Sequence, residues 1–316
     1  MQQTSLDNID LQIIRLLAKD SRTPYKDIAS AVGITSNAAK ERVNKMISND
    51  VIERFAVRIN PVIFGYEREC ILTLRNIDKT IREQEVLNRI SLLGDIIVYV
   101  KHLEGTAGFV LYVRAGAEDK IATLSDLLKP VSVESIFVSY RPITMRIHSS
   151  DFEIIKCLLS NPRMSIDDIA KESSLSSKTV KRRLEMMGDS HIVEFSILTN
   201  LSATQLTGYV EFAALISIDI NYYQKIVERL YEEMEEYLFY IPNSYQKEFI
   251  FAVFFCANIS TVNSILRRLE SYDGVEEVRD FIGTGRVYYQ DWLNKEVDKR
   301  IGQKHLLSSS SQQQQQ

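Results

Sequence analysis

The sequence has little of what a disulfide-stabilised, membrane-spanning or secreted protein needs. It contains only 3 cysteines in 316 residues, an odd number spread along the chain, which argues against a disulfide framework and for a reducing compartment. No run of about 18 apolar residues occurs, so a transmembrane helix is excluded. Residues 1–10 are polar and lack the apolar segment of a signal peptide. We therefore expect a cytoplasmic protein.

Metal-binding and catalytic patterns are also scarce. The four histidines, none of which has a partner at metal-ligand spacing, are His102, His148, His191 and His305. Cys70 and Cys256 stand in apolar runs and are interpreted as core residues rather than nucleophiles. Gly283-x-Gly285 lacks the strand–turn–helix setting of a nucleotide-binding motif and is predicted to be a loop. We expect no metal, no cofactor and no catalytic residue.

What the sequence does contain is an internal repeat. Residues 10–52 align without a gap on residues 151–193, and 12 of these positions are identical. An offset of 141 residues is too long for a solenoid repeat. The repeat therefore indicates duplication of a two-domain unit.

Each repeated block has the spacing of three short helices. In the first block, Asp7 is a plausible N-cap for a helix with one apolar face. Pro24 suits the first turn of a second helix, and Gly33 suits its left-handed C-terminal residue. Thr35 or Ser36 then caps a third helix that runs to about residue 48. The pattern predicts a helix-turn-helix unit, followed by a strand at 51–59 that could form a wing.

The segments between the helical blocks predict a different unit. Strands are expected at 66–75, 96–100, 109–113 and 133–140, with helices at 80–93 and 117–128. The second copy has strands at 209–219, 237–241, 248–256 and 275–282, with helices at 221–236 and 260–271. The order βαββαβ is that of a ferredoxin-like sheet covered by two helices.

These patterns divide the chain into five parts within an α+β fold. We predict winged helix-turn-helix domains at 1–60 and 148–200, ferredoxin-like domains at 61–147 and 201–290, and an extension at 291–316. Its Ser/Gln-rich end is expected to be disordered. The net charge of −4 splits into +2, 0, −1 and −5 over residues 1–60, 61–147, 148–200 and 201–316. The acidity therefore lies in the last part and does not exclude a nucleic-acid partner.

The third helix of each helical block is basic and is the predicted recognition helix. A basic helix at the same place in two duplicated units is the local charge pattern that DNA phosphates need. Helical geometry places Asn37, Glu41 and Asn44 opposite the apolar side, whereas Arg42 and Arg183 lie near its border. We interpret these two arginines as pinning the helix or touching phosphate. The candidate DNA-contacting residues are Ser36, Asn37, Lys40, Glu41, Arg42, Asn44, Lys45, Ser177, Lys178, Lys181, Arg182 and Arg183.

At this point the sequence resembles the Lrp/AsnC regulators. The matching motifs are Asp10-Leu11, Ile13-Ile14-x-Leu16-Leu17, Asp27-Ile28-Ala29, Arg42-Val43-x-x-Met46, Val51-Ile52 and Asn60-Pro61 with Gly65. The resemblance covers about residues 5–147 and, more weakly, 148–290. It implies a winged helix followed by a ligand-sensing RAM domain, in the tandem form found among archaeal regulators. It further implies association through the RAM domains.

The same resemblance locates candidate effector residues. The family has a Gly-x-x-Asp-Tyr loop before the third sheet strand. The matching stretch here holds Gly105, Thr106 and Gly108 without the acid, whereas the second copy holds Tyr245 and Glu248. If an amino acid binds, we expect it at the second copy, because Glu248 can hold an ammonium group.

The sequence thus favours a DNA-binding transcription regulator that is not an enzyme. Its expected partners are double-stranded DNA, a second copy of the chain and a small effector; a homodimer is favoured over pairing of the two copies inside one chain. Two alternatives remain. Siroheme decarboxylases resemble the same two-domain unit, and His102 is a candidate histidine for such an enzyme. The other is a ligand-binding adaptor that has lost DNA binding.

Overall fold

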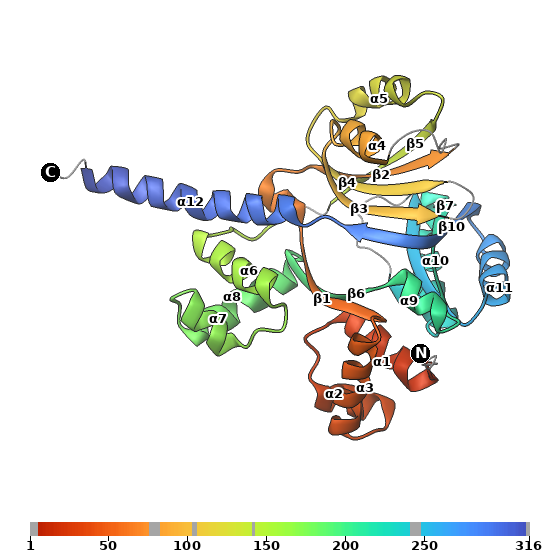
Figure 1. Ribbon diagram of the computed structural model, residues 1–316, viewed down its shortest axis with the longest axis horizontal. Helices are drawn as coiled ribbons and strands as arrows, with labels where there is room; N and C mark the ends of the chain where they lie inside the picture. Colours follow the sequence, from red (N-terminus) through yellow and green to blue (C-terminus); the bar gives the residue numbers. More distant parts are fainter. Residues whose placement is uncertain (1–5, 76–82, 103–105, 141–142, 241–247, 314–316) are drawn as a thin grey trace.

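The computed structural model describes residues 6–75, 83–102, 106–140, 143–240 and 248–313, with side chains described as far as Gly302 (Figure 1). Two helix-turn-helix units lie below and beside two packed sheet units. The first consists of α1 (Asn8–Lys19), α2 (Tyr25–Val32) and α3 (Ser36–Ser48), and the second of α6 (Ser149–Ser160), α7 (Ile166–Glu172) and α8 (Ser177–Asp189).

The start and stop signals of the first unit are confirmed. Asp7 and Asp10 form a capping box at the start of α1. Gly33 ends α2 in the left-handed region at φ 73°, and the Thr35 hydroxyl accepts a hydrogen bond from the backbone N–H of Ala38 at the start of α3. Local sequence therefore sets the boundaries of this unit.

The strand after each helix-turn-helix unit does not form a wing by itself. β1 (Ile52–Ile59) pairs antiparallel with β6 (Val193–Thr199), the equivalent strand of the other copy. This two-stranded ladder is separate from the large sheet. Its pairing satisfies backbone groups that an isolated strand would leave open. The ladder joins the two helix-turn-helix units.

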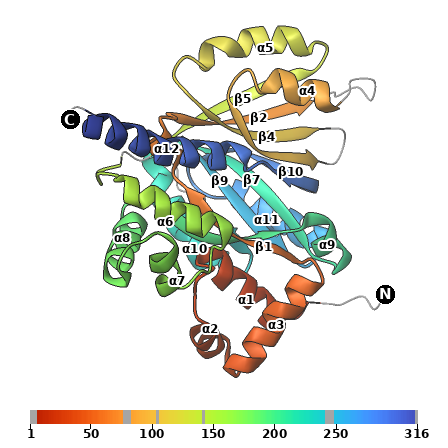
Figure 2. The same cartoon turned by 60° about the vertical axis from the view of Figure 1, so that its left-hand side comes forward.

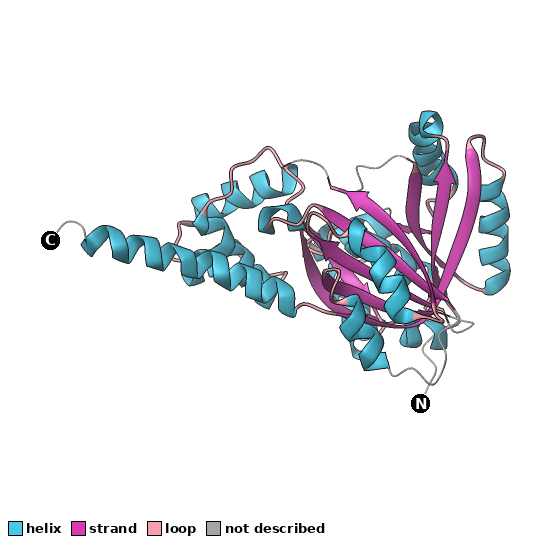
Figure 3. Cartoon of the chain, turned by 90° about the horizontal axis from the view of Figure 1, so that it is seen from above, coloured by secondary structure: helices cyan, strands magenta, loops and turns pink. Residues whose placement is uncertain are grey.

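The remaining strands form an eight-stranded sheet in the order β5-β2-β4-β3-β10-β7-β9-β8. The strands of the first copy are β2 (Arg68–Arg75), β3 (Asp95–His102), β4 (Ala107–Val113) and β5 (Ser132–Ser139). Those of the second are β7 (Val210–Ile218), β8 (Leu238–Tyr240), β9 (Phe249–Cys256) and β10 (Val275–Tyr288). Helices cover the outer sides of the strands (Figure 3).

The helices between the strands lie where the βαββαβ pattern predicts them, and a short additional helix, η1 or α9, precedes the first strand of each copy. The first copy has η1 (Pro61–Phe64), α4 (Glu83–Ile90), η3 (Glu118–Lys120) and α5 (Ile121–Leu128). The second has α9 (Leu201–Leu206), η4 (Ile220–Tyr222), α10 (Tyr223–Glu233) and α11 (Ile259–Glu270). Figure 2 shows α4 and α5 over one half of the sheet. None of the described helices is both long enough and apolar enough to cross a bilayer.

β10 continues beyond the predicted end of its strand. Residues 275–282 pair with β7 of the same copy, and Gly283 to Tyr288 pair with β3 of the other copy. The prediction of a loop at Gly283-x-Gly285 is therefore wrong. The register of the β10–β3 pairing shifts between Gly283 and Gly285, which marks a bulge in β10. The bulge lies where β10 stops pairing with β7 and begins to pair with β3. A single strand thus joins the two sheet units.

The apolar strand β9 is buried on both faces within one chain. Ile250 and Phe254 point to the core beneath α10 and α11. Val253 and Phe255 point the other way and pack into the core of the first helix-turn-helix unit. The sequence favours a second chain as the partner of these sheets. In the structure the two copies pair with each other inside one polypeptide, because the ladder and β10 hold them together.

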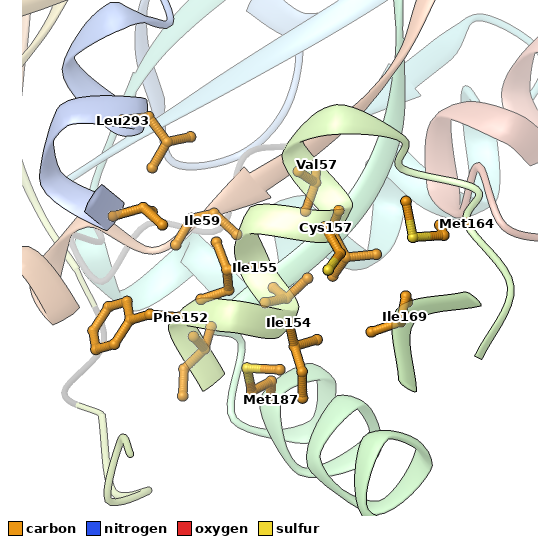
Figure 4. Packing of buried hydrophobic residues seen from close by; sticks show 14 of the residues in the cluster. Val57, Ile59, Phe152, Ile154, Ile155, Cys157, Met164, Ile169, Met187 and Leu293 are labelled. Carbon is orange, nitrogen blue, oxygen red and sulfur yellow. The ribbon is translucent and has the colours of Figure 1, made fainter. Parts of the chain in front are cut away.

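The C-terminal segment is a helix rather than a disordered tail. α12 covers Asp291–Gln313, and residues 314–316 lie outside the described chain. Trp292, Leu293 and Val297 bury its first turns against the second helix-turn-helix unit, in the core around Ile155 (Figure 4). Once these first turns are folded, extending the helix by further residues costs little free energy, and glutamine is a good helix former.

Candidate nucleic-acid interface

The exposed face of α3 carries most of the predicted contact residues. Ser36, Asn37, Lys40, Glu41, Asn44 and Lys45 are all exposed. Ala39, Val43 and Met46 are buried in the core of the unit. The apolar side of α3 is therefore anchored, and the polar side faces solvent along most of the helix.

The exposed face of α8 has a different chemistry. Ser177, Lys178, Lys181 and Arg182 are exposed, and no asparagine stands on the helix. The Ser177 hydroxyl donates to a carboxylate oxygen of Asp167 over 2.7 Å, which ties α8 to α7. Val180 and Met187 are buried beneath it. The two recognition helices thus present similar charge but different hydrogen-bonding groups.

Arg42 and Arg183 pin their helices, which is one of the two roles we expected of them. Arg42 contacts Asp7 and Asp10, each over 2.8 Å. In the second copy Arg183 donates through Nε to Asp151 over 2.5 Å, and it also bonds that carboxylate through Nη2. Arg183 is 5% exposed and so does not reach the surface of α8. We therefore do not propose Arg183 as a DNA contact.

Two further arginines, at equivalent positions of the repeat, join the two helix-turn-helix units by hydrogen bonds. Neither was predicted to have a role. Arg22 donates to the carbonyl oxygens of Pro162 and Met164 over 2.8 and 2.9 Å. Arg163 donates to the carbonyl oxygen of Thr23 over 3.2 Å. These arginines are one of the identical pairs in the repeat, at the same offset of 141 as the helices. The identity of Arg22 and Arg163 in the repeat alignment is the sequence signal that indicates a shared role.

The turn before each recognition helix keeps its geometry although the sequence changes. Gly33 has φ 73° in the first copy, and Ser174 stands at the same place with φ 56° in the second. A serine in this region is more strained than a glycine. The buried side of α8 fixes the turn, so the helix-turn-helix geometry survives the substitution.

The predicted effector residues are not brought into one site. Gly105 and Tyr245 lie outside the described residues. Thr106 and Gly108 lie where β3 turns into β4, and a Cβ on Gly108 would meet the His102 ring at 2.8 Å. Glu248 is exposed immediately before β9. The structure thus separates the two loops.

A cavity of about 270 Å³ lies between the two copies, under the β1–β6 ladder. Its walls come from the inner faces of β2, β4, β7 and β10, from the ladder, and from the start of α12. The lining is mostly apolar, as in small-molecule sites. No single segment contains this cavity, so no pattern along the sequence indicates it.

The cavity holds few charged groups. Glu211 is bonded to Arg286 over 2.6 Å and to the Thr199 hydroxyl over 2.5 Å. Glu69 accepts from the Tyr140 hydroxyl over 2.7 Å, and burial raises the pKa of its carboxyl. Burial lowers the pKa of His102 to about 4, so its ring is neutral at pH 7.

Metal-ligating side chains and thiols were the remaining candidates for reactive groups among the described residues. No group of three or more His, Cys, Asp or Glu among them could hold a metal ion. All three cysteines are buried, and burial raises the pKa of the Cys70 thiol to about 12 and of Cys256 to about 11. Thiols so protonated are poor nucleophiles.

Comparison with known proteins identifies both helical units. A family model described as the AsnC-type helix-turn-helix domain matches residues 6–47. A second, described as winged helix-turn-helix DNA-binding, matches residues 147–194. The two matches coincide with the two units of the fold.

The chain is also similar to named regulators over part of its length. It is 24% identical over 149 residues to the HTH-type transcriptional regulator FL11 of Pyrococcus furiosus, covering 47% of this chain and 95% of that protein. It is 36% identical over 73 residues to the HTH-type transcriptional regulator LrpA of Pyrococcus horikoshii, covering 23% and 50%. FL11 corresponds to about one half of the duplicated chain.

The chain also resembles a solved structure over most of its length. The siroheme decarboxylase NirDL aligns with 95% of this chain and 100% of its own, with a TM-score of 0.50 and 13% sequence identity. This likeness concerns the fold.

Proposed function

We propose that this chain, which carries an AsnC-type helix-turn-helix domain and a second winged helix-turn-helix domain, is a DNA-binding transcription regulator of the Lrp/AsnC type. The observation that carries the proposal is the pair of exposed basic helices, α3 and α8, held by one ladder. Both present lysines at positions that suit phosphate contacts. One polypeptide then supplies the two DNA-binding units that a simple regulator obtains by pairing two chains.

The proposed contact residues follow from exposure. On α3 they are Ser36, Asn37, Lys40, Glu41, Asn44 and Lys45, and on α8 they are Ser177, Lys178, Lys181 and Arg182. Asparagine pairs with adenine, and arginine pairs with guanine, in the major groove. Because only α3 carries exposed asparagines and only α8 an exposed arginine at this face, the two half-sites should differ. We therefore propose that the stretch of operator bound by one chain lacks palindromic symmetry.

Replacing both Lys40 and Lys45 by alanine should weaken binding to every DNA sequence. Each lost phosphate contact lowers the slope of log K against log salt by about 0.9, so the double variant should lose roughly 1.8 from the slope. Fluorescence anisotropy at several salt concentrations measures both quantities. The matched control is Lys120→Ala with Lys129→Ala, two exposed lysines on the first sheet unit. If the α3 variant behaves like this control, α3 is not the DNA-contacting helix.

Association of two chains remains part of the proposal. β5 is at one end of the sheet, and among the described strands only β2 pairs with it. An open edge of this kind is a template for pairing with another chain. We expect light scattering at micromolar concentration to give twice the chain mass of 36.3 kDa. A species of the single-chain mass alone, with and without DNA, would contradict the homodimer and leave the pairing within the chain as the complete DNA-binding unit.

The effector residues also remain proposals. Of the predicted set, Glu248 carries the charge that an amino group needs and is exposed at the start of β9. In the first copy, Gly108 lines the central cavity and lies against the His102 ring. An amino-acid effector at the family's usual loop would therefore bind the second copy.

A siroheme-modifying enzyme is the second candidate, because the NirDL-like fold extends over the whole chain and His102 lines the cavity. Against it stands the absence of any histidine between His191 and His305 in the sequence, so the second sheet unit offers no equivalent ligand. The absorption spectrum of the purified protein separates the two functions. A tetrapyrrole band that persists through gel filtration would favour the enzyme.

A further inference from the structure

The central cavity contains one carboxyl group, that of Glu69, whose pKa is raised by burial although the nearby positive charge of Arg58 acts to lower it. Arg286 is bonded to Glu211, and Arg58 lies 3.2 Å from Glu194. Glu69 itself accepts a hydrogen bond from the Tyr140 hydroxyl over 2.7 Å. A carboxylate in such apolar surroundings is costly unless a positive group joins it.

Aromatic rings surround this carboxyl group. The rings of Tyr112 and Tyr140 lie 6.0 Å apart in an edge-on arrangement, and those of Tyr112 and Trp292 lie 5.0 Å apart. Tyr112 is the residue of β4 that pairs with Glu69 of β2, so the ring and the carboxyl group leave the sheet side by side. An anionic group beside aromatic faces is the chemistry that recognises organic cations.

The other end of the cavity is polar but carries no unpaired charge. The His102 Nδ1 atom is buried without a hydrogen-bond partner in the described chain, and the ring lies against Gly108. Gly108 and Tyr112 are four residues apart on β4, which is about 13 Å along a strand. A small amine at Glu69 therefore does not reach His102.

We propose that the cavity between the two copies binds a small organic monocation with an apolar body, held by Glu69 and the rings of Tyr112 and Trp292. The site differs from both loops that the sequence resemblance indicated. It borders Ala56–Ile59 of β1 and Ser196–Thr199 of β6, the ladder that positions the recognition helices. A regulatory effect of the ligand rests on the proposed function, whereas binding itself does not.

Trp292 supplies a direct readout, because it is the only tryptophan of the chain and lines the cavity. The probes are phenethylamine, its neutral counterpart 2-phenylethanol and its anionic counterpart 3-phenylpropionate. The full-length protein is titrated with each, and Trp292 emission and calorimetric heat are followed. We expect phenethylamine to bind at least tenfold more tightly than the alcohol, since a hydrogen bond to a charged group is among the stronger ones.

The Glu69→Gln variant should lose about 10- to 100-fold in affinity for the amine and little for the alcohol. Tyr140 can still donate to the new amide oxygen, so the fold should tolerate the change. Glu67→Gln is the matched control, because Glu67 is exposed two residues away and does not line the cavity. Tyr112→Leu removes the ring but keeps Glu69, and should likewise weaken the amine more than the alcohol.

Equal affinity for the three probes, tighter binding of the acid, or no response of Trp292 together with no heat would overturn the proposal. Loss of amine selectivity in the Glu67→Gln control would do the same. DNA binding is measured separately by anisotropy. Amine binding without DNA binding would overturn the proposed function and support the cavity, whereas DNA binding without amine binding would overturn the cavity alone.

Discussion

The Arg183→Ala variant is expected to lose about 3–5 kcal/mol in free energy of unfolding, because it leaves a buried carboxylate without its partner. Asp151 is 0% exposed and accepts from Arg183 and from the backbone N–H of His148. Alanine removes the guanidinium but not the negative charge. Urea denaturation of the full chain, followed by circular dichroism, measures the change.

The repeat provides a matched control at the equivalent position. Arg42 makes the same kind of contact in the first copy, but its side chain is 31% exposed, and those of its partners Asp7 and Asp10 are 53% and 14% exposed. Exposed ion pairs are worth about 0–1 kcal/mol, so Arg42→Ala should cost far less. Equal costs for the two variants would show that the burial of the Arg183 pair does not matter to stability.

Phe255→Ala is expected to cost about 3–5 kcal/mol, as is usual for a large ring removed from a core. Phe255 is 1% exposed, stacks on Tyr209 at 5.5 Å, and packs into the core of the first helix-turn-helix unit. The substitution therefore tests whether that unit is fixed to the second sheet. If the unit were tethered only by its linker, this face of β9 would be solvent-exposed.

Denaturation measures this cost alongside Leu206→Ala, whose side chain is 69% exposed and should lose no more than about 0.5 kcal/mol. Equal, small losses for the two variants would mean that the helix-turn-helix unit is free of β9 in solution. A large loss for Phe255→Ala alone supports one continuous core. Limited proteolysis adds a second reading, because a detached unit would be cleaved near residue 60.

The candidate interface was predictable because its signals are local. Caps such as Thr35 and stops such as Gly33 act within one turn of a helix, and the apolar spacing of α3 settles which side chains face solvent. The same angular argument placed Arg42 and Arg183 at the border of the core. It could not tell the exposed ion pair from the buried one, since burial depends on what packs over the helix.

Prediction failed where a segment meets a distant one. The Ser/Gln tail has a disordered composition, yet α12 continues into it from turns anchored by Trp292. Gly283 and Gly285 indicate a loop by composition, but β3 of the other copy offers them a partner. In each case a contact made far along the chain outweighed a weak local preference.

The sequence by itself determined the duplication, the type of each unit and the basic faces of α3 and α8, because these follow from periodicity, capping and charge within short segments. Only the tertiary structure decided that β1 pairs with β6, that Arg22 and Arg163 each donate hydrogen bonds to the opposite unit, and that Glu69 and Trp292 line one cavity. Those contacts join residues many positions apart. Their energies depend on which surfaces the two copies bury against each other, and no periodicity within a segment encodes that choice.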